Sequence, residues 1–212
     1  MSKTLTYETE IPTVKILLTG LPGVGKTQIL RVLLSEPFEP TYQSTIGVDF
    51  RRKQIEINNE NYKLQILDLT GKEETKLPIL KEYYQSAQAI IYVYDVTDTS
   101  EKAREGILKI RKEFEDLGLE CDKYLWVVCG NKIEERDNRK TSVEEGNTIA
   151  KQFDSEFFEV SAKNNKYIID LFQKTVIWLR PKLKDETEMF EKRRTDHPNK
   201  TKEDNNKCCI IV

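Results

Sequence analysis

Cysteine, histidine, methionine and tryptophan are scarce in this chain of 212 residues, which has four, one, two and two of them. Cys121 and Cys129 are isolated in the sequence, and Cys208 and Cys209 are adjacent near its end. This spacing argues against the disulfide framework of a small secreted protein. We therefore expect a chain that is made and kept in the reducing cytosol, with Cys121 and Cys129 as structural thiols.

Long apolar runs and an excess of positive charge are also missing. No stretch is long enough to span a bilayer, and residues 1–10 lack the apolar centre of a secretory signal, so we expect neither kind of segment. The net charge of −2 leaves no excess of cations to displace the counterions of a nucleic acid, so we expect no nucleic-acid partner. Apolar residues at 38% and charged residues at 33% are typical of one soluble domain with some additional chain.

Residues 20–27 have the sequence GLPGVGKT and match the phosphate-loop pattern. The residues that the pattern requires are Gly20, Gly25, Lys26 and Thr27. An apolar run at 14–19 predicts a strand before the loop, and residues 28–34 predict a helix after it. In that context, backbone N–H groups and the helix N-terminus bind phosphate oxygens. Lys26 is predicted to reach the β- and γ-phosphates, and Thr27 to offer its hydroxyl to Mg²⁺.

Strands and helices alternate along the rest of the chain. The expected strands cover residues 14–19, 48–58, 62–69, 87–94, 124–129 and 157–160. The expected helices cover residues 28–34, 77–86, 100–117, 142–153 and 168–179. The second and third strands form an antiparallel hairpin with a turn at 59–61, whereas 87–94 is continuously apolar, as in a covered parallel sheet. We expect a three-layer α/β fold: a six-stranded, mainly parallel sheet with one antiparallel edge strand, and about five helices on its two faces.

The pattern of strands and helices divides the chain into three parts. Residues 1–11 are a short lead-in, residues 12–180 a domain, and residues 181–212 a tail. The tail mixes charges of both signs with Asn and Thr and has few apolar residues, so it is predicted to be a flexible linker. Within the domain, the charged run at 134–140 is predicted to be a solvated loop.

Ligands of such sheets bind at the carboxyl ends of the strands. Besides the phosphate loop, polar segments follow three of the predicted strands: DLTG at 68–71, GNKIE at 130–134 and SAK at 161–163. Asp68 is suited to contact Mg²⁺ through water, and the N–H of Gly71 could approach a γ-phosphate. Four such segments at one edge of a sheet are a much stronger signal than any of them alone.

Together these segments resemble the Ras superfamily of small GTPases. The Rab branch fits best, because of IGVDF at 46–50, KLQI at 63–66, YY at 83–84 and YDVT at 94–97. The resemblance covers about residues 12–180, and the terminal cysteine pair extends it. It implies a P-loop G domain that binds GTP and hydrolyses it to GDP and phosphate.

The resemblance also assigns roles around the base. Asn131 would bond the guanine ring, Lys132 would lie across it, and Glu134 would accept from its N1–H and 2-amino groups. Ala162 would donate its backbone N–H to the guanine oxygen, and Phe38 would pack edge-on against the base. The residues implied to bind GTP are Gly20, Gly23, Val24, Gly25, Lys26, Thr27, Gln28, Phe38, Tyr42, Thr45, Gly71, Asn131, Lys132, Glu134, Ser161, Ala162 and Lys163.

Mg²⁺ is the implied cofactor of the phosphate end, held by Thr27 and Thr45 and, through water, by Asp68. Tyr42 could cover the phosphates. The implied catalytic residues are Lys26, Thr45, Gly71 and Lys72. Two segments, about 38–48 and 69–82, would be switches that GTP and Mg²⁺ order and that partners recognise.

Five residues depart from the family pattern: Pro22, Leu67, Thr70, Lys72 and Glu134, of which the last two bear on hydrolysis and on the base. Lys72 stands where a glutamine usually orients the attacking water, and an ammonium has three donors but no acceptor. We therefore expect slow intrinsic hydrolysis. Glu134 replaces the usual aspartate; it keeps the carboxylate, so guanine stays the expected base, but we expect weaker or less selective binding.

The chain ends in CCIIV, and Cys209 with the three residues behind it matches a prenylation signal. Cys208 and Cys209 resemble the tails of Rab proteins that carry two geranylgeranyl groups. The resemblance implies a monomeric switch in vesicle trafficking and protein transport. It would sit on the cytoplasmic face of an endomembrane or the plasma membrane and cycle with the cytosol. The implied partners are an exchange factor, a GTPase-activating protein, effectors, and a prenyl-binding escort or GDP-dissociation inhibitor.

Two alternatives stay open at the level of sequence. The first is a GTP-loaded binding module or scaffold that hardly hydrolyses and is controlled by exchange, which a hydrolysis assay would distinguish. The second, an ATP-using phosphate-loop enzyme, is disfavoured, because Asn131 and Lys132 followed by the carboxylate of Glu134 fit guanine.

Overall fold

The computed structural model describes residues 11–39, 48–69 and 78–181. The chain divides into two compact units, Met1–Ile177 and Trp178–Val212, and all strands of the sheet belong to the first. The strands are β1 (Thr13–Gly20), β2 (Val48–Ile57), β3 (Glu60–Leu69), β4 (Ala89–Asp95), β5 (Leu125–Asn131) and β6 (Glu156–Glu159). The helices are α1 (Lys26–Leu33), α2 (Pro78–Ser86), α3 (Ser100–Asp116), α4 (Val143–Gln152) and a last helix over 168–181.

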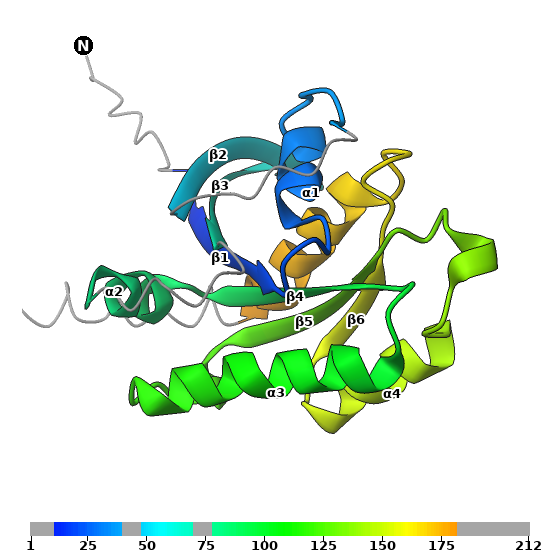
Figure 1. The fold of residues 1–212 in the computed structure, drawn as a ribbon. Helices are drawn as coiled ribbons and strands as arrows, with labels where there is room; N and C mark the ends of the chain where they lie inside the picture. The colour runs from blue at the N-terminus through cyan, green and yellow to red at the C-terminus, as the bar shows by residue number, and fades with distance from the viewer. Residues whose placement is uncertain (1–10, 40–47, 70–77, 182–212) are drawn as a thin grey trace, which may run out of the picture. The chain divides into compact units, whose positions relative to one another are not determined.

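The six strands form one sheet in the order β2-β3-β1-β4-β5-β6 (Figure 1). Only β2 and β3 pair antiparallel, and all other neighbours are parallel. The predicted fold class, a mainly parallel sheet with one antiparallel edge strand and helices on both faces, is therefore confirmed.

Burial explains why the central strands are apolar without alternation. All seven residues of β4 are buried, because helices cover both of its faces. On one face, Leu17, Ile90 and Trp126 pack with Phe114 of α3 and Tyr84 of α2. The aromatic rings of this cluster are stacked or edge-on, with centroids 4.7 to 5.3 Å apart.

The hairpin turn differs from the sequence prediction. The antiparallel ladder continues to the pair Ile57 and Glu60, so the turn consists of Asn58 and Asn59 alone and not of residues 59–61. Both asparagines have positive φ, at 51° and 63°. Two-residue hairpin loops favour this conformation because its twist matches that of the strands, and asparagine tolerates it better than most residues.

The charged run at 134–140 is also more ordered than a solvated loop. It contains a short 3₁₀ turn, η2 (Arg136–Asn138), and a second such turn, η1 (Cys121–Lys123), lies before β5. Arg139 forms two hydrogen bonds to the carboxylate of Glu159, at 2.8 and 3.0 Å. The planar guanidinium matches a carboxylate in this way, which fixes the run to the end of β6.

No helix within the described ranges is long and apolar enough to cross a membrane. The lead-in up to residue 10 and the tail from 182 onward lie outside the described residues.

Candidate functional site

The phosphate loop connects β1 to α1 through glycines with positive φ, of which Gly25 at 96° immediately precedes the helix. A Cβ on Gly25 would lie only 2.4 Å from Nδ2 of Asn131, so both the dihedral and the space require glycine. Among the described residues, no side chain caps the N-terminus of α1. The first N–H groups of the helix can therefore face an anion.

Lys26 curls back over the loop that precedes it. Its ammonium donates to the carbonyl oxygens of Gly20 at 2.9 Å and Leu21 at 3.1 Å, and the residue is 7% exposed. Burial lowers the pKa of Lys26, and the nearby carboxylate of Asp68 opposes this shift. A phosphate at the same place would add negative charge and compensate for the lost hydration of the ammonium.

Thr27 and Asp68 meet beside this lysine. The Thr27 hydroxyl donates to Oδ2 of Asp68 at 2.7 Å, and Asp68 is 1% exposed. Burial raises the pKa of Asp68, while the Thr27 hydrogen bond and the charge of Lys26 lower it. Oδ1 of Asp68 is buried and has no hydrogen-bond partner in the described structure. Hydroxyl and carboxylate oxygens are the ligands that Mg²⁺ prefers, so the residues fit a magnesium ion and its water shell.

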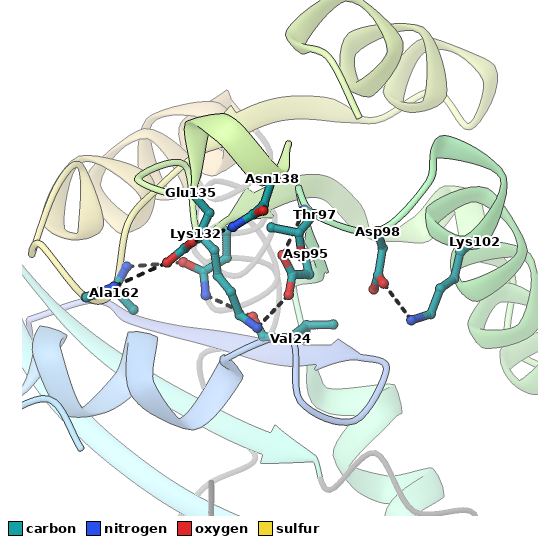
Figure 2. Close-up of polar contacts among 11 residues, drawn as sticks. Val24, Asp95, Thr97, Asp98, Lys102, Lys132, Glu135, Asn138 and Ala162 are labelled. Atoms are coloured by element: carbon teal, nitrogen blue, oxygen red, sulfur yellow. Dashed lines mark hydrogen bonds and ion pairs between the residues drawn. The ribbon is translucent and has the colours of Figure 1, made fainter. Parts of the chain in front are cut away.

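Asn131, at the end of β5, joins two other loops of the site. Its Nδ2 donates to the carbonyl oxygen of Val24 at 2.9 Å, and its Oδ1 accepts from the N–H of Ala162 at 3.1 Å. Figure 2 shows Val24 and Ala162 on either side of this link. Because Asn131 is 1% exposed, both bonds are shielded from water. The Asn131 side chain therefore fixes the three loops relative to one another.

Lys132 follows with a φ of 69°, which is uncommon for a residue other than glycine. Its ammonium forms an ion pair with Oδ2 of Asp95, the last residue of β4 (Figure 2). The other oxygen of Asp95 accepts from the N–H and the hydroxyl of Thr97, at 2.9 and 2.8 Å. This arrangement fixes the ammonium of Lys132 to the end of β4.

Glu134 has one carboxylate oxygen, Oε2, that is buried and without a hydrogen-bond partner in the described ranges. The neighbouring Glu135 instead pairs with Lys163 and Asn138, both at 3.2 Å (Figure 2). These two hydrogen bonds lower the pKa of Glu135. The two adjacent glutamates therefore differ. Glu135 is paired with residues of the chain, whereas Oε2 of Glu134 is available to accept a hydrogen bond from a ligand.

Hydrogen bonds join several of the predicted residues near the ends of β1, β3 and β5, namely Gly20, Val24, Lys26, Thr27, Asp68, Asn131 and Ala162. Ser161 contributes its hydroxyl oxygen to the N–H of Asn164 at 3.0 Å, and Phe38 is half-buried after α1. Gln28 accepts from the N–H of Glu39 at 3.0 Å, a contact within the chain. The predicted residues that lie outside the described ranges are Tyr42, Thr45, Gly71, Lys72, Cys208 and Cys209.

Sequence reasoning missed the roles of Asp95, Thr97 and Glu135. Asp95 orients Lys132, Thr97 fixes Asp95, and Glu135 holds Lys163. The rule on strand ends could have found Asp95, because it ends a strand that lies between two strands with predicted site segments. Glu135 gave no such signal, since it stands in a charged run.

Comparison with known proteins agrees with this geometry. The Ras family model matches residues 15–180. Ras-related protein Rab-13 of Bos taurus is 38% identical over 161 residues, which cover 74% of this chain and 75% of that protein. Ras-related protein Rab-8A of Gallus gallus is 38% identical over 159 residues, which cover 74% of each chain. GTP-binding protein ypt2 of Schizosaccharomyces pombe is 33% identical over 160 residues, or 75% and 77% of the two chains. The chain therefore belongs to the Ras family and is a GTP-binding small GTPase of the Rab branch.

Proposed function

We propose that this chain is a switch that binds GTP with Mg²⁺, hydrolyses it slowly, and acts on a membrane in vesicle trafficking. The assignment of a guanine nucleotide rests on the buried Oε2 of Glu134, which has no hydrogen-bond partner in the described ranges. It lies in the same loop as Asn131, whose side chain is hydrogen-bonded to Val24. A buried acceptor without a donor is costly, and the N1–H and 2-amino groups of guanine would supply two donors.

In this proposal the residue roles follow the site. Lys26 binds the β- and γ-phosphates, Thr27 and Asp68 hold the magnesium ion together with Thr45, and Asn131 and Ala162 contact the base. When bound, Mg²⁺ would offset the negative charge of the phosphates. The proposed domain boundaries are those of the sequence: lead-in 1–11, G domain 12–180 and tail 181–212.

Base selectivity tests the nucleotide assignment. We expect GDP to bind much more tightly than ADP, and Glu134→Gln to weaken GDP by about tenfold or more, because an amide donor would then face the donors of guanine. ADP affinity should hardly change in that variant. Titration calorimetry with both nucleotides measures this, and Glu144→Gln, at an exposed position of α4, is the matched control. Equal affinities for GDP and ADP would refute a guanine site.

Lys72 leads to the proposal of slow hydrolysis. An ammonium has no acceptor for a hydrogen bond from the attacking water, whereas a glutamine amide both accepts and donates hydrogen bonds. We expect Lys72→Gln to raise the single-turnover rate of GTP hydrolysis about tenfold or more, with nucleotide affinity unchanged. Equal rates in the two proteins would show that Lys72 does not set the rate. If neither protein hydrolyses GTP, the scaffold controlled by nucleotide exchange becomes the better proposal.

Membrane attachment is proposed to depend on Cys208 and Cys209. Two lipid chains give stable anchoring, whereas a single chain binds a membrane only marginally. In cells, we expect Cys208→Ser with Cys209→Ser to move the protein from membranes to the cytosol, and either single variant to give partial release. Fractionation with imaging measures this. Unchanged membrane association of the double variant would rule out anchoring through these residues.

The proposed partners follow from the family. An exchange factor, a GTPase-activating protein and effectors would recognise the nucleotide state, and a prenyl-binding escort or GDP-dissociation inhibitor would carry the lipidated tail. The proposed localisation is the cytoplasmic face of an endomembrane or the plasma membrane.

A further inference from the structure

The chain turns sharply where α1 ends. Ser35 has a φ of 65°, in the left-handed region that few residues other than glycine adopt. Its N–H donates to the carbonyl oxygen of Val32 at 2.9 Å. The N–H of Glu36 donates to the carbonyl oxygen of Arg31 at 2.8 Å. These two bonds form the Schellman motif that commonly ends a helix, so the backbone of residues 35–36 is fixed to the last turn of α1.

The side chain of Arg31 continues this attachment along residues 36–39, which we call the 36–39 segment. Its Nε donates to the carbonyl oxygen of Pro37 at 3.1 Å, and its Nη2 forms an ion pair with Oε1 of Glu39 at 2.9 Å. Gln28, one turn earlier in α1, accepts from the N–H of Glu39 at 3.0 Å. The segment is therefore bonded to α1 through its backbone as well as through its charges.

A second arginine reaches the 36–39 segment from β2. The Nη1 of Arg51 donates to Oε1 of Glu36 at 3.2 Å, and its Nε donates to Oδ2 of Asp49 at 2.8 Å. The other carboxylate oxygen of Glu36 lies 4.0 Å from Nε of Arg31, so this carboxylate stands between two guanidinium groups. Hydrogen bonds between charged groups are stronger than neutral ones, and here they connect the segment to both α1 and β2.

Phe38 is the residue that these contacts surround. Its two neighbours, Pro37 and Glu39, are both bonded to α1, and Phe38 itself is half-buried. The family resemblance gives Phe38 the role of packing edge-on against guanine, and such a contact depends on the distance and the angle of the ring. Because α1 begins at Lys26 and Thr27, the same helix holds the phosphate end of the proposed site and the segment that carries the ring.

We propose that Arg31 and Arg51 are positioning residues for the guanine base. They hold the 36–39 segment so that the ring of Phe38 stays against the base, and they thereby slow the release of GDP. This role rests on the proposed function, because it requires a guanine nucleotide in the site. It adds two residues that have no other role there, from the end of a helix and from the edge strand of the sheet.

A second route from Arg51 to the nucleotide leads through Asp68. The ladder between β2 and β3 places Asp49 opposite Asp68. Burial raises the pKa of Asp68, and among the smaller effects the charge of Asp49 raises this pKa and the charge of Arg51 lowers it. An arginine that acted by this route would affect the magnesium end of the site. The two routes differ in one respect, because only the first depends on the ring of Phe38.

The release of a fluorescent GDP measures the proposed effect. The full chain is loaded with N-methylanthraniloyl-GDP and Mg²⁺, an excess of GDP is added, and the decay of fluorescence gives the dissociation rate. The side chains of Arg31 and Arg51 are 22% and 38% exposed, so water screens their ion pairs in part. We expect Arg31→Gln and Arg51→Gln each to raise the rate about fivefold, and Phe38→Ala to raise it about tenfold or more.

The decisive variants combine each arginine change with Phe38→Ala. Without the ring there is nothing left to position, so Arg31→Gln and Arg51→Gln should then change the rate by less than about twofold. A general loss of stability, or a route through Asp68, would keep its full effect in this background. The variants therefore separate a positioning role from a purely structural one.

The matched controls are Arg52→Gln and Arg104→Gln. Arg52 follows Arg51 on β2, where successive side chains point to opposite faces of the sheet, and it is exposed. Arg104 is exposed on α3. Neither control should change the rate of GDP release.

Three results would overturn the proposal while the proposed function stands. They are an unchanged rate in the two arginine variants, arginine effects that persist at full size without the ring of Phe38, and equal effects in the controls. If Phe38→Ala releases GDP at the rate of the parent, the ring does not hold the base, which also contradicts the proposal. A parent chain that binds no GDP would instead refute the proposed function, and the positioning role with it.

Discussion

Replacing Asn131 with alanine is expected to lower both the stability of the protein and its affinity for GDP. The side chain bonds Val24 and Ala162 at once in a buried position, so its loss leaves a carbonyl oxygen and an N–H without partners. Each buried group left unsatisfied costs about 1 to 3 kcal/mol, so the free energy of unfolding without nucleotide should fall by about 2 to 6 kcal/mol. The loops would lose their fixed spacing, and GDP affinity should fall by about 100-fold or more, since about 1.4 kcal/mol corresponds to tenfold.

Two measurements separate the structural part of this effect from the loss of a base contact. Chemical denaturation of the nucleotide-free protein measures how much the Asn131 hydrogen bonds stabilise the fold. GDP titration measures the change in affinity at the site. Lys123→Ala is the matched control, because Lys123 pairs with Glu120 at the surface and is not among the implied GTP-binding residues, and exposed ion pairs contribute about 1 kcal/mol or less. If Asn131→Ala loses GDP affinity at unchanged stability, Asn131 acts on the base alone, and the linking role is wrong.

The position of the candidate site in the fold could be predicted from the sequence, because its parts are short segments with fixed spacing. A phosphate loop needs glycines, a lysine and a hydroxyl within eight residues, and the flanking strand and helix were visible from apolar patterns. The strand-end rule then placed Asp68, Asn131 and Ala162 at one edge, where the structure has them. Local chemistry and topology were therefore sufficient to predict the phosphate loop and the edge of the sheet at which the other segments lie.

Side-chain pairing between distant segments could not be predicted in the same way. Asn131 was expected to contact the base, but within the chain it bonds residues 107 and 31 positions away. Likewise, the partner of Lys132, which follows β5, is Asp95 at the end of β4. Several donors and acceptors lie along the same edge of the sheet, and only the three-dimensional arrangement decides which of them meet.

The close packing of helices on the sheet was equally invisible in the sequence, and it leads to the second large prediction. Gly106 lies in the middle of α3, where helix propensity alone predicts that alanine would stabilise by about 1 kcal/mol. The structure predicts the opposite sign. A Cβ on Gly106 would lie 2.1 Å from the hydroxyl oxygen of Tyr92, which is fully buried and donates to the carbonyl oxygen of Ala103 at 2.9 Å. Because the ring of Tyr92 is buried and its hydroxyl is hydrogen-bonded, neither can shift easily, so α3 would have to move away from β4.

Gly106→Ala should therefore lower the free energy of unfolding by about 2 kcal/mol, as overpacking of a core does, with a fall in Tm of about 4 to 8 °C. Glu105→Ala, at an exposed position of the same helix, is the control and should stay within about 0.5 kcal/mol of the parent.

The decisive variant combines Gly106→Ala with Tyr92→Phe. Without the hydroxyl, the nearest atoms to the new Cβ are the ring carbon Cζ at 3.1 Å and Cγ of Leu21 at 3.3 Å, which small shifts can relieve. Tyr92→Phe alone should cost about 1 kcal/mol through the lost hydrogen bond, so the pair should be more stable than the sum of the single variants predicts. Strict additivity of the two changes would contradict the close contact between α3 and β4.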